Sequence, residues 1–340
     1  MDVSQSRFSG QGQQPEPAPV NDPRLQPTPD YGTLGPGSDI AGSGPISTPS
    51  PANAKRFAPF LAAAIGVLFA ILAANIGSAH AAWARFATLF SPHESAPASE
   101  KDSRQLDRMK PQKQAEALLE LAVGHSDAAV DQISSRVARW QGRVQWNPQI
   151  ATLTTAALNS SDMRVRESGI EVELAAYGLG KNSASLDYLL RTAESADHAR
   201  KIWALWALGL MGNRGVETDR VVQVLTAHLK DADVDSRRWA VEGLAVTASS
   251  QTIDPLLKTM HDDPSPLVRE RAACSLAVAG MFTREQRLTA VPQLLNYTDD
   301  PSLDAQTHSW AFQALSDITG QRLPHDSSAW RSWYDSAKGD

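Results

Sequence analysis

The residues that most often carry chemistry are sparse in this 340-residue chain. No two of its eight histidines lie three to five residues apart, so the helical H-x-x-x-H pattern of a zinc site is absent from the sequence. The chain also lacks a G-x-S-x-G elbow, a Walker loop and a dinucleotide-binding glycine motif. We therefore expect no metal, no cofactor and no small-molecule substrate, and a protein that is not an enzyme.

One cysteine and two acidic pairs are the remaining candidates for chemistry. Cys274 lies in an apolar helical pattern, which is typical of an inert buried thiol, and a single cysteine excludes an intrachain disulfide. Asp262-Asp263 and Asp299-Asp300 precede predicted helices. We expect these aspartates to cap the helices that follow, with a divalent-ion site as the alternative.

A short helical pattern returns four times between residues 200 and 317. In each copy an alanine is followed four residues later by a leucine, so both side chains lie on one face of a helix. The successive alanines are 36, 32 and 39 residues apart, a period typical of stacked helical hairpins. These alanines are Ala204, Ala240, Ala272 and Ala311.

Tryptophan or arginine precedes each of these alanines, and a further tryptophan follows the first. The set is Trp203, Trp206, Trp239, Arg271 and Trp310. If the second helix of each hairpin lines a concave face, these residues form a stripe with hot-spot chemistry: apolar rings, indole N–H groups and a cation. They are the candidate partner-binding residues. The alternative is that each ring fills the space between hairpins, which aromatic residues at helical spacing favour.

Helical periodicity begins at about Arg104 and continues to the end of the chain, with almost no alternating segment of strand length. We expect an all-α solenoid of about six helical hairpins over residues 104–340, closed by a capping helix whose Trp330 and Trp333 cover the last hairpin. The predicted helix pairs are 112–123 with 127–140, 148–158 with 163–178, 184–194 with 198–211, 217–230 with 234–247, 251–261 with 265–280, and 284–297 with 303–318, followed by 327–336.

Two consecutive units show the clearest form of the repeat. Asp231 precedes Arg237 by six residues, and Asp263 precedes Arg269 by six. This pattern resembles HEAT repeats, in particular the bacterial type related to phycobilin-lyase repeats, and the resemblance covers about residues 145–320. It implies an armadillo-like α-solenoid. It also implies that these four residues are structural: hydrogen-bonded pairs that tie each turn to the next helix and form a ladder between units.

The chain before the repeats divides into three segments. Residues 1–56 form a Pro-, Gly- and Ser-rich tail whose apolar residues are too few to offset the entropy of ordering, so we expect disorder. A predicted transmembrane helix over 57–78 begins with an uncharged apolar run that, at ~1.5 Å per residue, spans the ~30 Å hydrocarbon layer. Residues 79–103 form an interfacial segment and linker.

The charges that flank the apolar run predict its orientation. Lys55 and Arg56 precede it and only Arg85 follows closely. We therefore expect a single-pass protein of a bacterial inner membrane, with the N-terminus in the cytoplasm and the repeat domain in the periplasm. Two alternatives remain open. The A-x-A motif at 79–81 is compatible with a cleaved secretory signal, and the reverse orientation would place the repeats in the cytosol.

The function expected from these features is passive. A net charge of −6 and a pI of about 5.8 argue against nucleic-acid binding. We expect a non-catalytic, membrane-anchored scaffold that binds a protein partner through a preformed solenoid surface, at little ordering cost. The alternatives are an enzyme related to the bilin lyases and a purely structural spacer.

Overall fold

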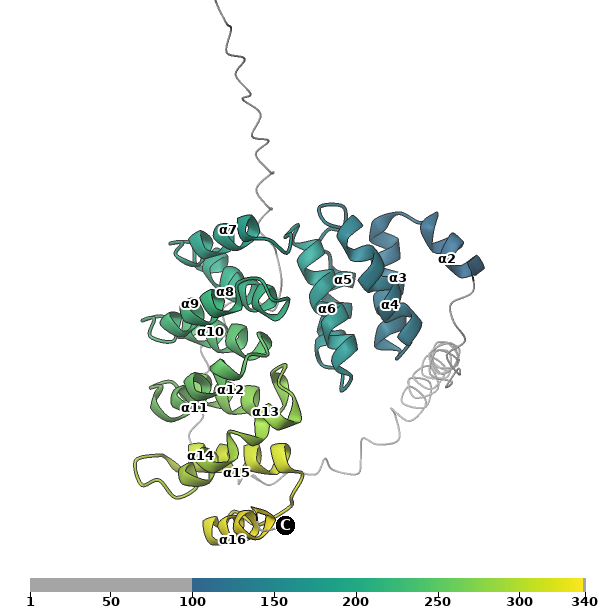
Figure 1. Cartoon of the computed structure of the whole chain (residues 1–340). Coiled ribbons are helices and arrows are strands. Elements are labelled where there is room, and N and C mark those ends of the chain that lie inside the picture. Colours follow the sequence, from purple (N-terminus) through teal and green to yellow (C-terminus); the bar gives the residue numbers. More distant parts are fainter. Residues whose placement is uncertain (1–99, 339–340) are drawn as a thin grey trace, which may run out of the picture. The chain divides into compact units, whose positions relative to one another are not determined.

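The computed structural model describes residues 100–338 of the chain (Figure 1). Every regular element within this range is a helix, and the range contains no strand. The expectation of an all-α fold is therefore confirmed. The predicted tail 1–56, the predicted membrane helix 57–78 and most of the predicted linker lie outside the described residues. Among residues 100–338, no helix is long and apolar enough to cross a membrane.

The helices follow one another with short connections. Their bounds are α2 Glu100–Asp107, α3 Pro111–Val123, α4 Asp127–Arg136, η3 Val137–Arg139, α5 Pro148–Leu158, α6 Met163–Ala176, α7 Ser183–Ala193, α8 His198–Asn213, α9 Thr218–His228, α10 Val234–Val246, η4 Ser250–Thr252, α11 Ile253–Asp262, α12 Pro266–Cys274, η5 Ser275–Ala279, α13 Arg284–Leu288, α14 Val291–Tyr297, α15 Ala305–Thr319 and α16 Ser327–Lys338.

Four predicted helices differ from the structure. Those predicted over 127–140 and 251–261 include the short 3-10 helices η3 and η4. The segment predicted as one helix over 284–297 is split into α13 and α14, with Pro292 in the first turn of α14, where its missing N–H costs nothing. The helix predicted over 265–280 continues from α12 into η5, a single π-helical turn that ends at Ala279 and is followed by Gly280 as C-cap. Isolated π turns inside α-helices are rare and are often found at functional sites.

Aspartate side chains begin most of the second helices, but not at every predicted position. Asp197, Asp233 and Asp304 are N-caps of α8, α10 and α15, and each accepts a backbone N–H from the first turn. The prediction that Asp263 and Asp300 cap helices is wrong. They accept the N–H groups of Ser265 and Ser302, which lie in the loops before α12 and α15. The helices begin later because each of these loops is a turn closed by its own aspartate.

Helices α7–α16 share one apolar core. The first helices α7, α9, α11 and α14 each pack on the second helix that follows them, α8, α10, α12 and α15, and these second helices contact one another in chain order. The contact between α8 and α10 is especially close. A Cβ atom on Gly209 would lie 2.4 Å from the carbonyl oxygen of Gly243, so only glycine lets the two backbones meet.

Helices α3–α6 surround a second core that includes Leu118, Ile133, Trp140 and Ile150. Helix α6 belongs to both cores, because its Ile170 and Leu174 pack with α7 and α8. After Gly178, which has a φ of +73°, the chain passes through Asn182 into α7.

Helix α16 ends the described chain against α14. Trp330 is 1% exposed and donates its indole N–H to the carbonyl of Pro324, and the ring of Trp333 packs edge-on against it. Arg331 donates to the carboxylate of Asp299 at 2.8 Å. The two tryptophans predicted to cover the last hairpin therefore lie against it, one in the core and one half-buried.

Candidate functional site

Arg237 connects two turns of the chain through its guanidinium group. Nη1 donates to the main-chain carbonyls of Asp231 and Ala232, at 3.0 and 3.2 Å, in the turn before its own helix. Nε and Nη2 donate to the two carboxylate oxygens of Asp263, at 2.8 and 3.1 Å, in the next unit. Hydrogen bonds that Arg237 donates to Asp263 raise the pKa of Arg237, against the opposing effect of burial. Such a two-pronged, buried ion pair fixes both distance and orientation.

Arg269 repeats this arrangement one unit further along. Nη1 donates to the carbonyl of Asp263 at 2.9 Å, Nη2 to the carboxylate of Asp304 at 2.6 Å, and Nε to the hydroxyl of Thr307 at 3.1 Å. One unit earlier, the ammonium group of Lys201 lies 2.9 Å from the carboxylate of Asp231. We call the three pairs Lys201–Asp231, Arg237–Asp263 and Arg269–Asp304 the ion-pair ladder.

The structure changes one detail of the predicted ladder. Within a unit, Arg237 is joined to Asp231 through the carbonyl oxygen of Asp231 and not through its carboxylate. That carboxylate points to the preceding unit. Burial alone would raise the pKa of Asp231, but hydrogen bonds from Lys201 and from the N–H of Asp233 outweigh burial and hold the pKa below its usual value. Carboxylates therefore join neighbouring units, and carbonyls join a turn to its own helix.

Three of the four tryptophans in the candidate partner-binding set lie inside the protein. Trp203, Trp206 and Trp239 are 6%, 8% and 5% exposed. The indole N–H of Trp206 donates to the carboxylate of Glu173 on α6, at 2.6 Å. The indole N–H groups of Trp203 and Trp239 are buried without a hydrogen-bond partner in the structure. So little exposed ring surface leaves these three side chains few contacts to offer a partner.

Arg271 and Trp310, the other two members of that set, are half-buried. Arg271 Nε lies 2.9 Å from Glu242 Oε1 as an ion pair and makes no hydrogen bond. Cys274 lies one helical turn after Arg271. Burial raises the pKa of the Cys274 thiol, outweighing the charge of Arg271, which lowers it. A neutral thiol is a weak nucleophile.

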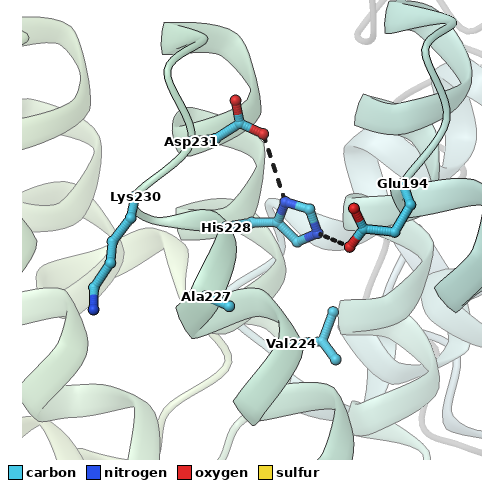
Figure 2. Close-up of a pocket in the computed structure, with 6 residues that line it drawn as sticks. All are labelled: Glu194, Val224, Ala227, His228, Lys230 and Asp231. Carbon is cyan, nitrogen blue, oxygen red and sulfur yellow. Dashed lines mark ion pairs between the residues drawn. The ribbon is translucent and has the colours of Figure 1, made fainter.

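A cavity of about 330 Å³ with both polar and apolar walls lies between the ends of α7 and α9 (Figure 2). The imidazole of His228, on α9, points between two carboxylates: Nε2 lies 3.5 Å from Glu194, and Nδ1 lies 3.6 Å from Asp231. Val224 and Ala227 provide apolar walls, and Lys230 extends away from the imidazole.

This cavity was not predicted from the sequence. His228 and Asp231 are three residues apart and lie on one side of the chain, but Glu194 comes from another hairpin, and no local pattern connects it to them. Both carboxylates are acceptors, so the cavity suits a donor group. Among residues 100–338, no group of three or more His, Cys, Asp or Glu side chains is arranged to hold a metal ion.

The fold and these contacts define an all-helical protein whose successive hairpins are joined by ion pairs. No protein-family model and no curated protein matches the chain. One solved structure that matches is the crystal structure of an engineered protein from the Northeast Structural Genomics Consortium. It is 18% identical, and the match covers 64% of this chain and 94% of that one with a TM-score of 0.30. A likeness of this size supports no conclusion about function.

Proposed function

We propose that the chain is a non-catalytic scaffold, built as a HEAT-like α-solenoid, that binds a protein partner through the surface of its repeats. The observation that carries this proposal is the ion-pair ladder. Each of its three pairs joins a second helix to the turn of the next unit, and two of the pairs add carbonyl contacts within the unit. Successive hairpins are thereby held in register, so a partner would meet a surface that needs little ordering.

The proposal includes a membrane anchor at residues 57–78 and a periplasmic repeat domain. It rests on the uncharged apolar run and on the flanking positive charges. A periplasm-active reporter fused after Asp340 tests it. Activity in the membrane fraction supports an anchored, outward domain. Activity in the soluble fraction supports cleavage near Ala81, and an inactive fusion that stays in the membrane overturns the orientation.

Photo-crosslinking in cells tests partner binding. A photoreactive residue is placed at Val234 or Leu267, exposed positions in the first turns of α10 and α12. Matched controls are the exposed Gln223 and Lys258 on the first helices α9 and α11. We expect one adduct of the same mass from Val234 and Leu267 and none from the controls. No adduct from any of the four positions would contradict a scaffold that binds through the surface of its repeats. Adducts of equal mass and yield from all four would contradict binding at one specific face.

The bilin-lyase alternative is tested at Cys274. A Cys274→Ala variant of a scaffold keeps its crosslinks, because the thiol is neutral and half-buried in a helix. Loss of a bilin-attachment activity in that variant, measured with free bilin and a candidate acceptor, would support the enzyme instead.

A further inference from the structure

Two arginines from distant parts of the chain hold the same helix end. Arg166, on α6, donates to the main-chain carbonyls of Val278 and Gly280, at 3.4 and 3.2 Å. Arg287, on α13, donates to the same two carbonyls, at 3.3 and 2.6 Å, and to that of Leu276 at 2.9 Å. The two guanidinium groups share two acceptors and are therefore close neighbours at the end of η5.

Neither arginine has an acidic partner among residues 100–338, in contrast to Arg237 and Arg269. Burial and the positive charge of Arg166 lower the pKa of Arg287 to about 10, and burial lowers the pKa of Arg166. Both groups stay charged at neutral pH. Opposite them is only the carbonyl end of a helix, which carries the equivalent of about half a negative charge. The two arginines and this helix end together therefore carry a net positive charge, although the formal net charge of the whole protein is −6.

Within residues 100–338, both guanidinium groups also keep N–H donors without an acceptor. A guanidinium has five N–H donors. Arg287 makes four hydrogen bonds, which leave one N–H on Nη1. Nη2 of Arg166 makes a single contact, which leaves one N–H there, and its bonds to the η5 carbonyls are long, at 3.2 to 3.5 Å. Both side chains are half-buried and so still reach solvent.

An exposed apolar side chain lies at the same helix end. Val278 is 48% exposed, the highest value among the large exposed hydrophobic residues of the described chain. It belongs to the π-helical turn η5, whose carbonyls both arginines hold. A ligand whose anionic group binds the guanidinium groups would therefore also lie next to the apolar side chain of Val278. An acidic peptide has apolar side chains that pack there, whereas an inorganic anion has none.

We propose that Arg166, Arg287 and Val278 form an anchor site for a carboxylate in an acidic, partly apolar segment of a protein partner. This inference rests on the proposed scaffold function and names the chemistry of its partner. The two guanidinium groups would donate hydrogen bonds to the carboxylate oxygens, because the planar guanidinium matches the geometry of a carboxylate. Val278 would pack against a neighbouring apolar side chain of the partner. Because Arg166 and Arg287 come from α6 and α13, the bound carboxylate would also join these two helices.

Peptide binding to the full-length protein in detergent micelles tests the site. The probe is a fluorescein-labelled peptide that alternates glutamate and leucine, and the control probe has glutamine in place of glutamate. Binding is followed by fluorescence anisotropy. We expect the glutamate peptide to bind about tenfold tighter or more, as for a charge-assisted pair, and salt to weaken it.

The decisive variant is Val278→Glu, with Val278→Gln as its matched control. A glutamate at this exposed position supplies a carboxylate from within the chain. We expect it to raise the melting temperature, because it neutralises the arginine pair, and to abolish peptide binding. Val278→Gln should leave the melting temperature unchanged and weaken binding only through the lost apolar contact. Arg287→Gln should weaken binding of the glutamate peptide about tenfold or more and leave the glutamine peptide unaffected.

Three outcomes would overturn the inference: equal binding of the two peptides, unchanged binding to Val278→Glu, or competition by inorganic phosphate as strong as by the glutamate peptide. The last would mean a site for small anions. Failure of this inference is separable from failure of the scaffold proposal. If crosslinks from Val234 and Leu267 persist in the Val278→Glu variant while the glutamate peptide does not bind wild type, the scaffold stands without this anchor.

Discussion

Arg237 and Arg166 occupy corresponding places early in second helices, and they end in different electrostatic surroundings. Each donates to a main-chain carbonyl six residues earlier, that of Asp231 and that of Ser160, so each ties its helix to the preceding turn. Arg237 then reaches a buried carboxylate in the next unit, whereas Arg166 reaches the end of η5 and a second arginine.

The difference arises from how the next unit is placed. Helices α8 and α10 meet backbone to backbone at Gly209 and Gly243, and Lys201 on α8 pairs with Asp231 in the turn before α10. Helix α6 instead meets α8 through side chains, with Trp206 bonded to Glu173. No carboxylate of the described chain pairs with the guanidinium of Arg166 at the end of η5. An arginine whose charge is balanced by a buried carboxylate stabilises the fold, whereas an arginine without such a partner is able to bind an external anion.

The largest expected effect is the loss of Arg237. Arg237→Met leaves the carboxylate of Asp263 buried at 3% side-chain exposure without its partner, so we expect a loss of about 3–5 kcal/mol in the free energy of unfolding, measured by urea denaturation. Arg164→Met is the control. Its pairs with Asp127 and Asp131 are exposed, so it should cost about 1 kcal/mol or less. Equal losses in the two variants would contradict a structural role specific to the ladder.

The next effect concerns the packing that aligns the ladder. Gly209→Ala places a methyl group 2.4 Å from the backbone of Gly243, so α8 and α10 must separate, at a cost of about 1–3 kcal/mol. The matched control is Gly212→Ala on the same helix, where the new methyl group meets methyl groups of Val221 and Thr247 at 3.0 and 3.1 Å, which need to shift only slightly. Its cost should be about 1 kcal/mol or less. Denaturation midpoints that shift equally would show that α8 and α10 are not closely packed.

A smaller effect separates the two kinds of arginine directly. Arg166→Met loses the 2.6 Å hydrogen bond to the carbonyl of Ser160 and the long bonds to the end of η5, but it relieves repulsion from Arg287, so we expect a net loss of about 1 kcal/mol in the free energy of unfolding. Double-mutant cycles sharpen the contrast. The coupling between Arg237 and Asp263 should be attractive, and that between Arg166 and Arg287 repulsive. Couplings of the same sign would show that the arginine pair is compensated after all.

The smallest effect is a pH dependence at the end of the ladder. The imidazole of His261 lies against Asp262 in its own unit, and its Nε2 lies 3.2 Å from Asp300 in the next one. Burial lowers the pKa of His261, but the two carboxylates outweigh burial and raise it above 6.5. Hydrogen bonds from Ser302 and His261 hold the pKa of Asp300 at about 2, so this aspartate stays charged above about pH 4.

The folded chain therefore binds the proton of His261 more tightly than the unfolded chain does. Its stabilising contribution is fully present below the unfolded pKa of about 6.5 and is lost as pH rises through the higher folded pKa. Melting temperatures between about pH 5.5 and 8.5 measure it. Wild type should lose more stability across this range than His261→Gln, and parallel curves for the two proteins would contradict the assignment.

The sequence alone determined the local features of this protein. Alanine and leucine four residues apart predicted the second helices, and all-helical structure follows over residues 100–338, because a helix face depends only on residues near in sequence. The six-residue spacing from Asp231 to Arg237 marked the turn-to-helix connection, although the acceptor is the carbonyl and not the carboxylate. The spacing places the arginine side chain beside the preceding turn, but it does not determine whether a carbonyl or a carboxylate of that turn accepts the hydrogen bond.

Only the tertiary structure decided which groups meet across units. The burial of Trp203, Trp206 and Trp239 depends on the helices that cover them, and the cavity at His228 depends on Glu194 from another hairpin. The approach of Arg166 to Val278 joins residues 112 positions apart, and no spacing in the sequence encodes it. Local periodicity fixes the face on which a side chain lies, whereas the partner of that face is set by how whole hairpins stack.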